Sequence, residues 1–156
     1  MTSPQLTASS SRHVAHFDGA CEPRNPGGFG GWGFVICDPS GVEVSTGSGL
    51  LPKGPEMTNN VAEYTAALEC LRAWIGLERR GGIVVHGDSK LVIEQMSRRW
   101  QVKQGAYVAV YRELRALVDA AKPDVAWEWV SRDLNARADE LSKRELIQHG
   151  VVIAKR

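Results

Sequence analysis

The chain has 156 residues, 43% of them hydrophobic and 24% charged, with a formal net charge of +1. This length is enough for one domain with a hydrophobic core and too short for two domains of ordinary size. With a net charge this close to zero, the protein does not bind polyanions through its overall charge. A local basic face is still compatible with this net charge.

The cysteines and the N-terminal residues bear on location. Cys21, Cys37 and Cys70 are widely spaced, and an odd number of isolated cysteines favours reduced thiols and a cytoplasmic protein. Residues 1–12 are rich in serine and threonine and lack the apolar segment of a signal peptide, so we expect a disordered tail. No apolar run approaches membrane-spanning length, and we expect no membrane contact.

The first part of the chain carries the pattern of strands. The segment DPSG at 38–41 predicts a turn, because proline and glycine occupy its second and fourth positions. We expect strands at residues 13–21, 31–38 and 42–51. The short turn makes the second and third of these strands a hairpin.

The rest of the chain alternates helices with strands. Apolar residues recur at spacings of three and four between Val61 and Ile75, which predicts a helix, and Thr58 and Asn59 are suited to cap it. We expect further helices at 89–100, 106–121 and 135–149, and strands at 81–88 and 124–131. This order predicts an α/β domain with a mixed sheet over residues 13–150, followed by a tail at 151–156.

Two acidic residues stand out in the first half. Asp18 lies within a strand, where aspartate is disfavoured, so it is either a lone acid with local partners or a residue that awaits a cation. Glu63 begins an apolar row of its helix, which directs it toward packed structure, although the helix dipole also favours an acid in the first turn.

Two more acids follow. Asp88 closes a strand and is either a helix N-cap or a site residue, because sites form at the carboxyl ends of strands in α/β sheets. Asp139 lies beside Glu140 early in the last helix, and periodicity does not choose between them. If the four acids converge, their repulsion favours divalent cations, and all-oxygen ligation suits Mg²⁺ or Mn²⁺.

Four segments together resemble the sequence blocks of type 1 ribonuclease H. In chain order they are FDGAC…NPGGFGGWGFVI, TNNVAEYTAAL, HGDSKLVIEQM and WVSRDLNARADELSK, spanning residues 13 to 146. The resemblance implies an α/β, RNase H-like fold: a five-stranded mixed sheet, with three antiparallel strands followed by two parallel to the first, flanked by helices. It also implies an endonuclease that cleaves the RNA strand of RNA/DNA hybrids.

The resemblance also implies a catalytic centre. It assigns the catalytic, metal-binding carboxylates to Asp18, Glu63, Asp88 and Asp139, and so separates Asp139 from Glu140. It implies hydrolysis with two ions of Mg²⁺ or Mn²⁺ per site, leaving 5′-phosphate and 3′-hydroxyl ends. It further implies that the proline- and glycine-rich turn after the first strand lets nucleic-acid backbone come close.

Other residues are expected to contact the hybrid, whose RNA strand differs from DNA by the 2′-hydroxyl. By the resemblance these are Gly19, Ala20, Cys21, Thr58, Asn59, Asn60 and Ser89. Thr58 matches a position that holds a DNA-strand phosphate in some relatives. Helix capping is the alternative role for Asn59 and Asn60.

The sequence departs from the family in two places. The loop before the last helix lacks the histidine that many members carry, so Arg132 or Asn135 is expected to take over part of its role, with helix capping the alternative for Asn135. The basic protrusion of some relatives is short here, and its residues either grip the DNA strand by charge and stacking or form a solvated helix end. These residues are Arg98, Arg99, Trp100 and Lys103.

Two other functions fit parts of the pattern. A nuclease of the same fold with another substrate, such as a DNA resolvase or transposase core, lacks the paired asparagines of TNNVAEY. A non-catalytic module that binds nucleic acid would have lost one of the four acids. We therefore expect a ribonuclease that acts on hybrids, as a monomer with no obligate protein partner.

Overall fold

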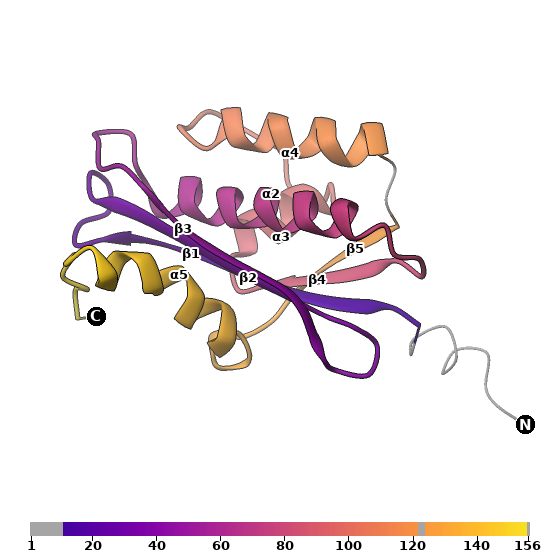
Figure 1. Ribbon diagram of the computed structural model, residues 1–156. Coiled ribbons are helices and arrows are strands. Elements are labelled where there is room, and N and C mark those ends of the chain that lie inside the picture. The colour runs from indigo at the N-terminus through magenta and orange to yellow at the C-terminus, as the bar shows by residue number, and fades with distance from the viewer. Residues whose placement is uncertain (1–10, 122–123, 156) are drawn as a thin grey trace, which may run out of the picture.

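A five-stranded sheet carries helices on both of its faces (Figure 1). The computed structural model describes residues 11–121 and 124–155, so the tail predicted at 1–12 lies almost entirely outside the described residues. The elements are β1 (His13–Glu22), β2 (Phe29–Cys37), β3 (Glu43–Leu51), α2 (Asn59–Leu77), β4 (Ile83–Gly87), α3 (Lys90–Met96), α4 (Val108–Ala121), β5 (Val125–Trp129), a 3-10 helix (Arg132–Leu134) and α5 (Ala136–Gln148).

The sheet has the strand order β3-β2-β1-β4-β5. The first three strands pair antiparallel, whereas β4 runs parallel to β1 and β5 runs parallel to β4. This confirms the predicted mixed sheet. His16 of β1 is level with His86 of β4, so Asp18 and Asp88, each two residues further on, are brought to the same end of the two central strands.

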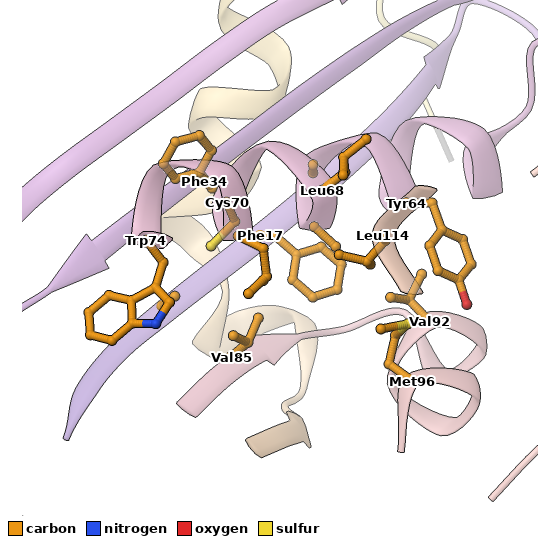
Figure 2. Close-up of a cluster of buried hydrophobic side chains, with 14 of the residues drawn as sticks. Phe17, Phe34, Tyr64, Leu68, Cys70, Trp74, Val85, Val92, Met96 and Leu114 are labelled. Carbon is orange, nitrogen blue, oxygen red and sulfur yellow. The ribbon is translucent and has the colours of Figure 1, made fainter. Parts of the chain in front are cut away.

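The hydrophobic core lies between the sheet and α2 (Figure 2). Phe17, Tyr64, Leu71, Val85 and Leu114 are fully buried there. Each such side chain contributes about 1.5–3 kcal/mol when it leaves water, so this cluster holds α2 on β1 and β4. In turn α4 packs on the outer side of α2, and α5 covers the opposite face of the sheet (Figure 1).

Glycines in β2 allow α5 to lie directly on the sheet. A β carbon on Gly31 would come within 2.1 Å of the backbone oxygen of Ser142, and one on Gly33 within 2.5 Å of its nitrogen. Gly33 is level with Asp18, so Asp18 faces the same helix. These two glycines therefore serve helix packing; the predicted approach of nucleic-acid backbone to the preceding turn stays a prediction.

The helix predicted over 89–100 is shorter than expected. It ends at Met96, because Arg98 adopts a left-handed conformation (φ 64°) and the N–H groups of Arg99 and Trp100 both return to the carbonyl of Glu94. The basic residues of this segment therefore lie in a turn after the helix. No helix among the described residues is both long and apolar enough to cross a membrane.

Candidate active site

Three carboxylates from separate elements meet at one end of the sheet. One oxygen each of Asp18 on β1, Glu63 on α2 and Asp88 after β4 lies within 4.8 Å of the other two. Asp18 and Glu63 are each only 5% exposed, and Asp88 is half-buried. Three acids at this spacing repel one another in the ionised state, so the arrangement needs protons or cations.

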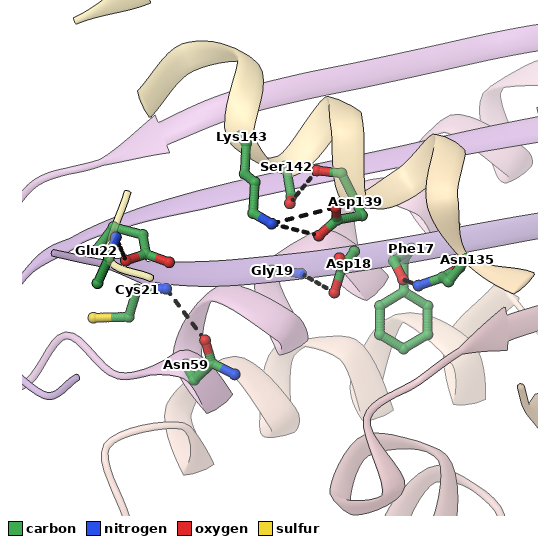
Figure 3. A network of polar contacts seen from close by, with 11 residues as sticks. Phe17, Asp18, Gly19, Cys21, Glu22, Asn59, Asn135, Asp139, Ser142 and Lys143 are labelled. Carbon is green, nitrogen blue, oxygen red and sulfur yellow. Dashed lines mark hydrogen bonds and ion pairs between the residues drawn. The ribbon is translucent and has the colours of Figure 1, made fainter. Parts of the chain in front are cut away.

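A glycine contact places Glu63 beside Asp18. A β carbon on Gly19 would lie 2.3 Å from the carbonyl carbon of Ala62 and 2.4 Å from the nitrogen of Glu63, so only glycine lets the first turn of α2 touch β1. The N–H of Gly19 also donates to Oδ1 of Asp18 at 3.0 Å (Figure 3). The same residue thus orients one carboxylate and admits the other.

Asp88 is available for the site because its neighbour caps the next helix. The Ser89 hydroxyl accepts the N–H of Val92 at 3.3 Å and is the N-cap of α3. The capping role that the sequence offered to Asp88 therefore falls to Ser89. The carboxylate of Asp88 extends from the carboxyl end of β4 toward Asp18, where sites of α/β sheets form.

Asp139 brings the fourth carboxylate from the first turn of α5. Its two oxygens lie 3.0 and 3.3 Å from Nζ of Lys143, one turn further along the helix (Figure 3). Glu140 instead pairs with Arg137 at 2.8 Å on the exposed side of the helix. The structure therefore turns Asp139 toward the cavity and Glu140 away from it, and the catalytic role of Asp139 stays a prediction.

The electrostatics of the cluster favour bound protons or cations. Burial raises the pKa of Asp18 to about 8, with further increases from the negative charges of Asp88 and Asp139. Burial, together with the charges of Asp18 and Asp88, also raises the pKa of Glu63 well above its ordinary value. Burial raises the pKa of Asp88 against the opposing charge of Arg132. Among the described residues, the buried Oε1 of Glu63 has no hydrogen-bond partner, which leaves it available as a ligand.

The four carboxylates open into a cavity of about 490 Å³. The other predicted residues that line it are Gly19, Ala20, Asn59, Asn60, Ser89 and Arg132. It thus combines oxygen ligands with amide and guanidinium donors. Such a site can bind divalent cations and a phosphate chain together.

Comparison with known proteins identifies the family. Residues 16–145 match the family model described as reverse transcriptase-like. A ribonuclease H of Gluconobacter oxydans (strain 621H) is 36% identical over 141 residues, which cover 81% of this chain and 87% of that protein. The chain belongs to the ribonuclease H family. This confirms the predicted class of enzyme, a ribonuclease H hydrolase.

Solved structures of the ribonuclease H family agree with the fold. The crystal structure of LC11-RNase H1 in complex with an RNA/DNA hybrid has a TM-score of 0.80 at 26% identity and covers 88% of this chain and 99% of that one. The N-terminal RNase H domain of Rv2228c from Mycobacterium tuberculosis, solved as a fusion with maltose-binding protein, has a TM-score of 0.78 at 30% identity. It covers 88% of this chain and 95% of that one, and the predicted fold class is confirmed.

Among the residues predicted from the ribonuclease H resemblance, Cys21, Thr58 and Asn135 lie near the carboxylate cavity but do not line it. Cys21 is 1% exposed; its N–H donates to Oδ1 of Asn59 and its thiol to the carbonyl of Arg24. Thr58 caps α2 by accepting the N–H of Val61. Asn135 holds the N-cap position of α5, but its amide Nδ2 reaches β1 and donates to the carbonyl of Phe17 at 2.9 Å (Figure 3).

Three of the four residues expected on the DNA strand line a second cavity. Arg99, Trp100 and Lys103 line a hollow of about 520 Å³, and Trp100 is 48% exposed. Arg98 lies outside this hollow and pairs with Asp119 at 3.7 Å. Gln95 links other residues that line this second cavity, because its amide donates both to the carbonyl of Gln101 and to the hydroxyl of Tyr107.

Four residues that line the carboxylate cavity were missed from the sequence. They are Glu22, Asn25, Trp129 and Lys143. Only Lys143 carried a readable signal, because a lysine four residues after Asp139 lies on the same side of a helix. The others reach the cavity through strand pairing and loop geometry, which local patterns do not reveal.

Proposed function

We propose that the chain is an endoribonuclease that hydrolyses the RNA strand of RNA/DNA hybrids. The observation that carries the proposal is the convergence of Asp18, Glu63 and Asp88 in one cavity, with Asp139 on its wall, in a chain of the ribonuclease H family. LC11-RNase H1, a structural relative, was solved with an RNA/DNA hybrid, which supports the same substrate here.

The four carboxylates are proposed to hold two divalent cations, Mg²⁺ or Mn²⁺. The all-oxygen donor set, the unpartnered Oε1 of Glu63 and the raised pKa of Asp18 support this fit. Such ions supply a nucleophilic water of lowered pKa and stabilise the departing oxygen, giving 5′-phosphate and 3′-hydroxyl ends. The chain's part is to fix four oxygen ligands from β1, α2, α5 and the end of β4.

The asparagines at the start of α2 are proposed to read the RNA strand. Oδ1 of Asn59 accepts the N–H of Cys21, which leaves its amide N–H groups to donate to a 2′-hydroxyl. Asn25 in turn accepts the backbone N–H of Asn59, so this segment is fixed before substrate arrives. Asn60 and the backbone of Gly19–Ala20 line the same cavity and extend the contact.

Roles for the other predicted residues follow from their places. Arg132 lines the cavity near Asp88, and we propose that it meets a phosphate there and fills part of the role of the missing loop histidine. Asn135 is proposed to act on the site from outside, through the carbonyl of Phe17. Ser89 lines the cavity and is proposed to contact the hybrid there. A phosphate of the DNA strand is proposed to lie near Thr58, at the start of α2.

The DNA strand is proposed to follow the second cavity. Its aromatic and basic side chains can stack on a sugar or base and neutralise phosphates. The residues assigned to this strand are Arg98, Arg99, Trp100 and Lys103. Because Arg98 and Arg99 are paired with Asp119 and Glu94, this grip is expected to be modest and strongly salt-dependent.

A monomer in the cytoplasm is the proposed working form. All four carboxylates come from one chain, so the site needs no second copy. The structure joins none of the three cysteines, all of them within the described residues, in a disulfide, which suits a reducing compartment. Residues 13–150 are proposed as the catalytic domain.

A gel assay with an end-labelled RNA strand tests the proposal. Wild type with Mg²⁺ or Mn²⁺ is expected to cut the RNA of a hybrid and to leave duplex DNA intact, whereas Asp18→Asn cuts neither. With the label at the 3′ end of the RNA, a labelled product whose mobility changes on phosphatase treatment carries a 5′-phosphate. A hybrid that is bound but uncut with both metals would establish a binding module instead. Equal cleavage of duplex DNA would establish a different nuclease.

A further inference from the structure

Trp129 joins the two residues on either side of the helix cap Ser89. Its indole N–H donates to the backbone oxygen of Asp88 at 3.1 Å, and Nζ of Lys90 lies 4.7 Å from the centre of its ring. Trp129 lines the carboxylate cavity and is 45% exposed. The tryptophan thus contacts a carboxylate residue and a lysine together.

Strand pairing sets this position of Trp129. Trp129 is level with Gly87 in the parallel β4–β5 ladder, and the next N–H, from Val130, donates to the carbonyl of Gly87 at 3.0 Å. The ladder ends there, and the indole supplies a donor to the following carbonyl, that of Asp88. The ring is thereby fixed against the backbone that carries the carboxylate.

Lys90 presents a charge that no acid in the described residues neutralises through a salt bridge. It is the first residue of α3, where the helix dipole disfavours a cation, so the helix does not account for the position of its ammonium. The face of Trp129 attracts it instead. Its neighbours Ser89 and Trp129 both line the cavity, so Lys90, which is not itself a lining residue, lies directly beside that wall.

A cavity lined by four carboxylates needs cationic groups at its edge if a phosphate chain is to enter it. Lys143 is already paired with Asp139. A long lysine side chain ordinarily loses rotamer freedom when it binds an anion, and a lysine that already rests on an aromatic face loses less. Lys90 therefore offers a charge that is held in place before substrate binds.

We propose that Lys90, held against Trp129, binds a phosphodiester of the strand that enters the carboxylate cavity, and that Trp129 is the residue that positions it. This rests on the proposed function and adds a contact to it. Lys90 recognises a phosphate group, and its contact with the ring of Trp129 orients the ammonium toward that phosphate.

The test measures binding of a fluorescent RNA/DNA hybrid by anisotropy on the Asp18→Asn background with Mg²⁺, over a range of salt concentrations. Lys90→Gln removes the charge, Trp129→Leu removes the ring and its N–H, and Trp129→Phe keeps a ring. Arg80→Gln is the matched control, since it removes one charge before β4, at the opposite end of that strand. Thermal unfolding followed by circular dichroism shows that each variant is folded.

Lys90→Gln is expected to weaken binding about tenfold at low salt, as for loss of a hydrogen bond to a charged group. It is also expected to lower the slope of log affinity against log salt by about one phosphate contact. Trp129→Leu is expected to weaken binding about 2- to 5-fold with the salt slope unchanged, because the charge stays but is no longer held. Trp129→Phe keeps a ring but loses the indole N–H, so its affinity is expected to lie between those of its parent and Trp129→Leu. The double variant Lys90→Gln/Trp129→Leu is expected to bind no more weakly than Lys90→Gln.

Three results would overturn the inference. If Lys90→Gln matches Arg80→Gln in affinity and salt slope, Lys90 does not contact phosphate. If the effects of Lys90→Gln and Trp129→Leu add in the double variant, Trp129 does not act through Lys90. A wild-type chain that neither binds nor cuts the hybrid would overturn the proposed function as well, and the wild type alone distinguishes this result from the first two.

Discussion

The ammonium of Lys143 lies 3.0 Å from Oδ1 and 3.3 Å from Oδ2 of Asp139, within the wall of the carboxylate cavity. A positive charge at this place offsets part of the negative charge of the cluster. It also competes with any cation that uses the same carboxylate. The pair therefore sets how strongly the cluster attracts divalent ions before substrate arrives.

Replacing Lys143 by methionine is expected to tighten Mg²⁺ binding. A partly exposed ion pair is worth about 0.2–1 kcal/mol, so the gain in affinity should be about 2- to 5-fold. Isothermal titration of the protein with Mg²⁺ alone measures this without substrate. Arg144→Met, an exposed neighbour on the same helix, is the control and should leave the affinity nearly unchanged. Weaker Mg²⁺ binding by Lys143→Met would show that Lys143 orients Asp139 rather than competes for it.

The stability of the metal-free protein should fall as pH rises above neutrality. Asp18 has a pKa of about 8 in the folded chain against 3.8 ordinarily, so between these values the folded state keeps a proton that the unfolded state has lost. His16, whose pKa burial lowers to about 4, has the opposite effect, but only below its ordinary value of 6.5. His13, whose pKa burial also lowers, behaves as His16 does, and the raised pKa values of the Cys37 and Cys70 thiols matter only near their ordinary value of 9.0. The carboxylates therefore dominate the window from about pH 7 to about pH 8.

Urea unfolding in EDTA across this window is the measurement. The free energy of unfolding should decrease toward the higher pH for wild type and change less for Asp18→Asn. Saturating Mg²⁺ should restore stability most at the higher pH, because the cation replaces the proton. A wild-type stability that is flat or rising over this window would contradict the raised pKa of Asp18.

Gly19→Ala should damage both the fold and the cluster. The added carbon would overlap the backbone of Ala62 and Glu63, so α2 must move away from β1. Overpacking of this kind costs about 1–3 kcal/mol, and Glu63 would leave Asp18. We expect a lower free energy of unfolding and weaker Mg²⁺ binding by titration.

Gly76→Ala is the matched control for this substitution. Gly76 lies on the same helix with open space around it, and alanine there should stabilise the protein by about 0.5–1 kcal/mol. Opposite signs for the two variants would establish that the close helix–strand contact, and not glycine content, matters. Equal effects of the two substitutions would contradict it.

The sequence alone predicted the features that local patterns carry. Strand and helix order follows from periodicity and turn residues, and Glu63 was separable from the solvent face of its helix. The residues alone suggested what the four acids would do if they converged, but not that they converge. The preference for Asp139 over Glu140 came from the family resemblance. The end of α3 at Met96 was not predictable, because its stop signal is a left-handed Arg98 rather than a glycine.

Features that depend on tertiary contact were missed for a common physical reason. Trp129 reaches the cavity only because β5 pairs with β4 in a register that places it level with Gly87. Asn135 holds the predicted N-cap position, yet its amide bonds to a carbonyl 118 residues earlier in the chain. A short polar side chain has both a local and a distant partner available, and packing decides between them.

We expect that contact to make Asn135 a positioning residue for Asp18. Its Nδ2 donates to the carbonyl of Phe17, one residue before the carboxylate, and the side chain is 1% exposed. Asn135→Ala should lower kcat about 10- to 100-fold, as for a residue that orients a metal ligand. The KM for the hybrid should change little, because the amide lies outside the cavity.

Asn135→Asp separates this role from substrate contact. An ionised aspartate would place an acceptor against the Phe17 carbonyl and add negative charge behind the cluster, so kcat should fall further than in Asn135→Ala. A protonated aspartate can donate again, and the deficit relative to wild type should shrink as the pH is lowered. Steady-state kinetics on a labelled hybrid across pH measures both effects. A raised KM with unchanged kcat would instead place Asn135 on the substrate.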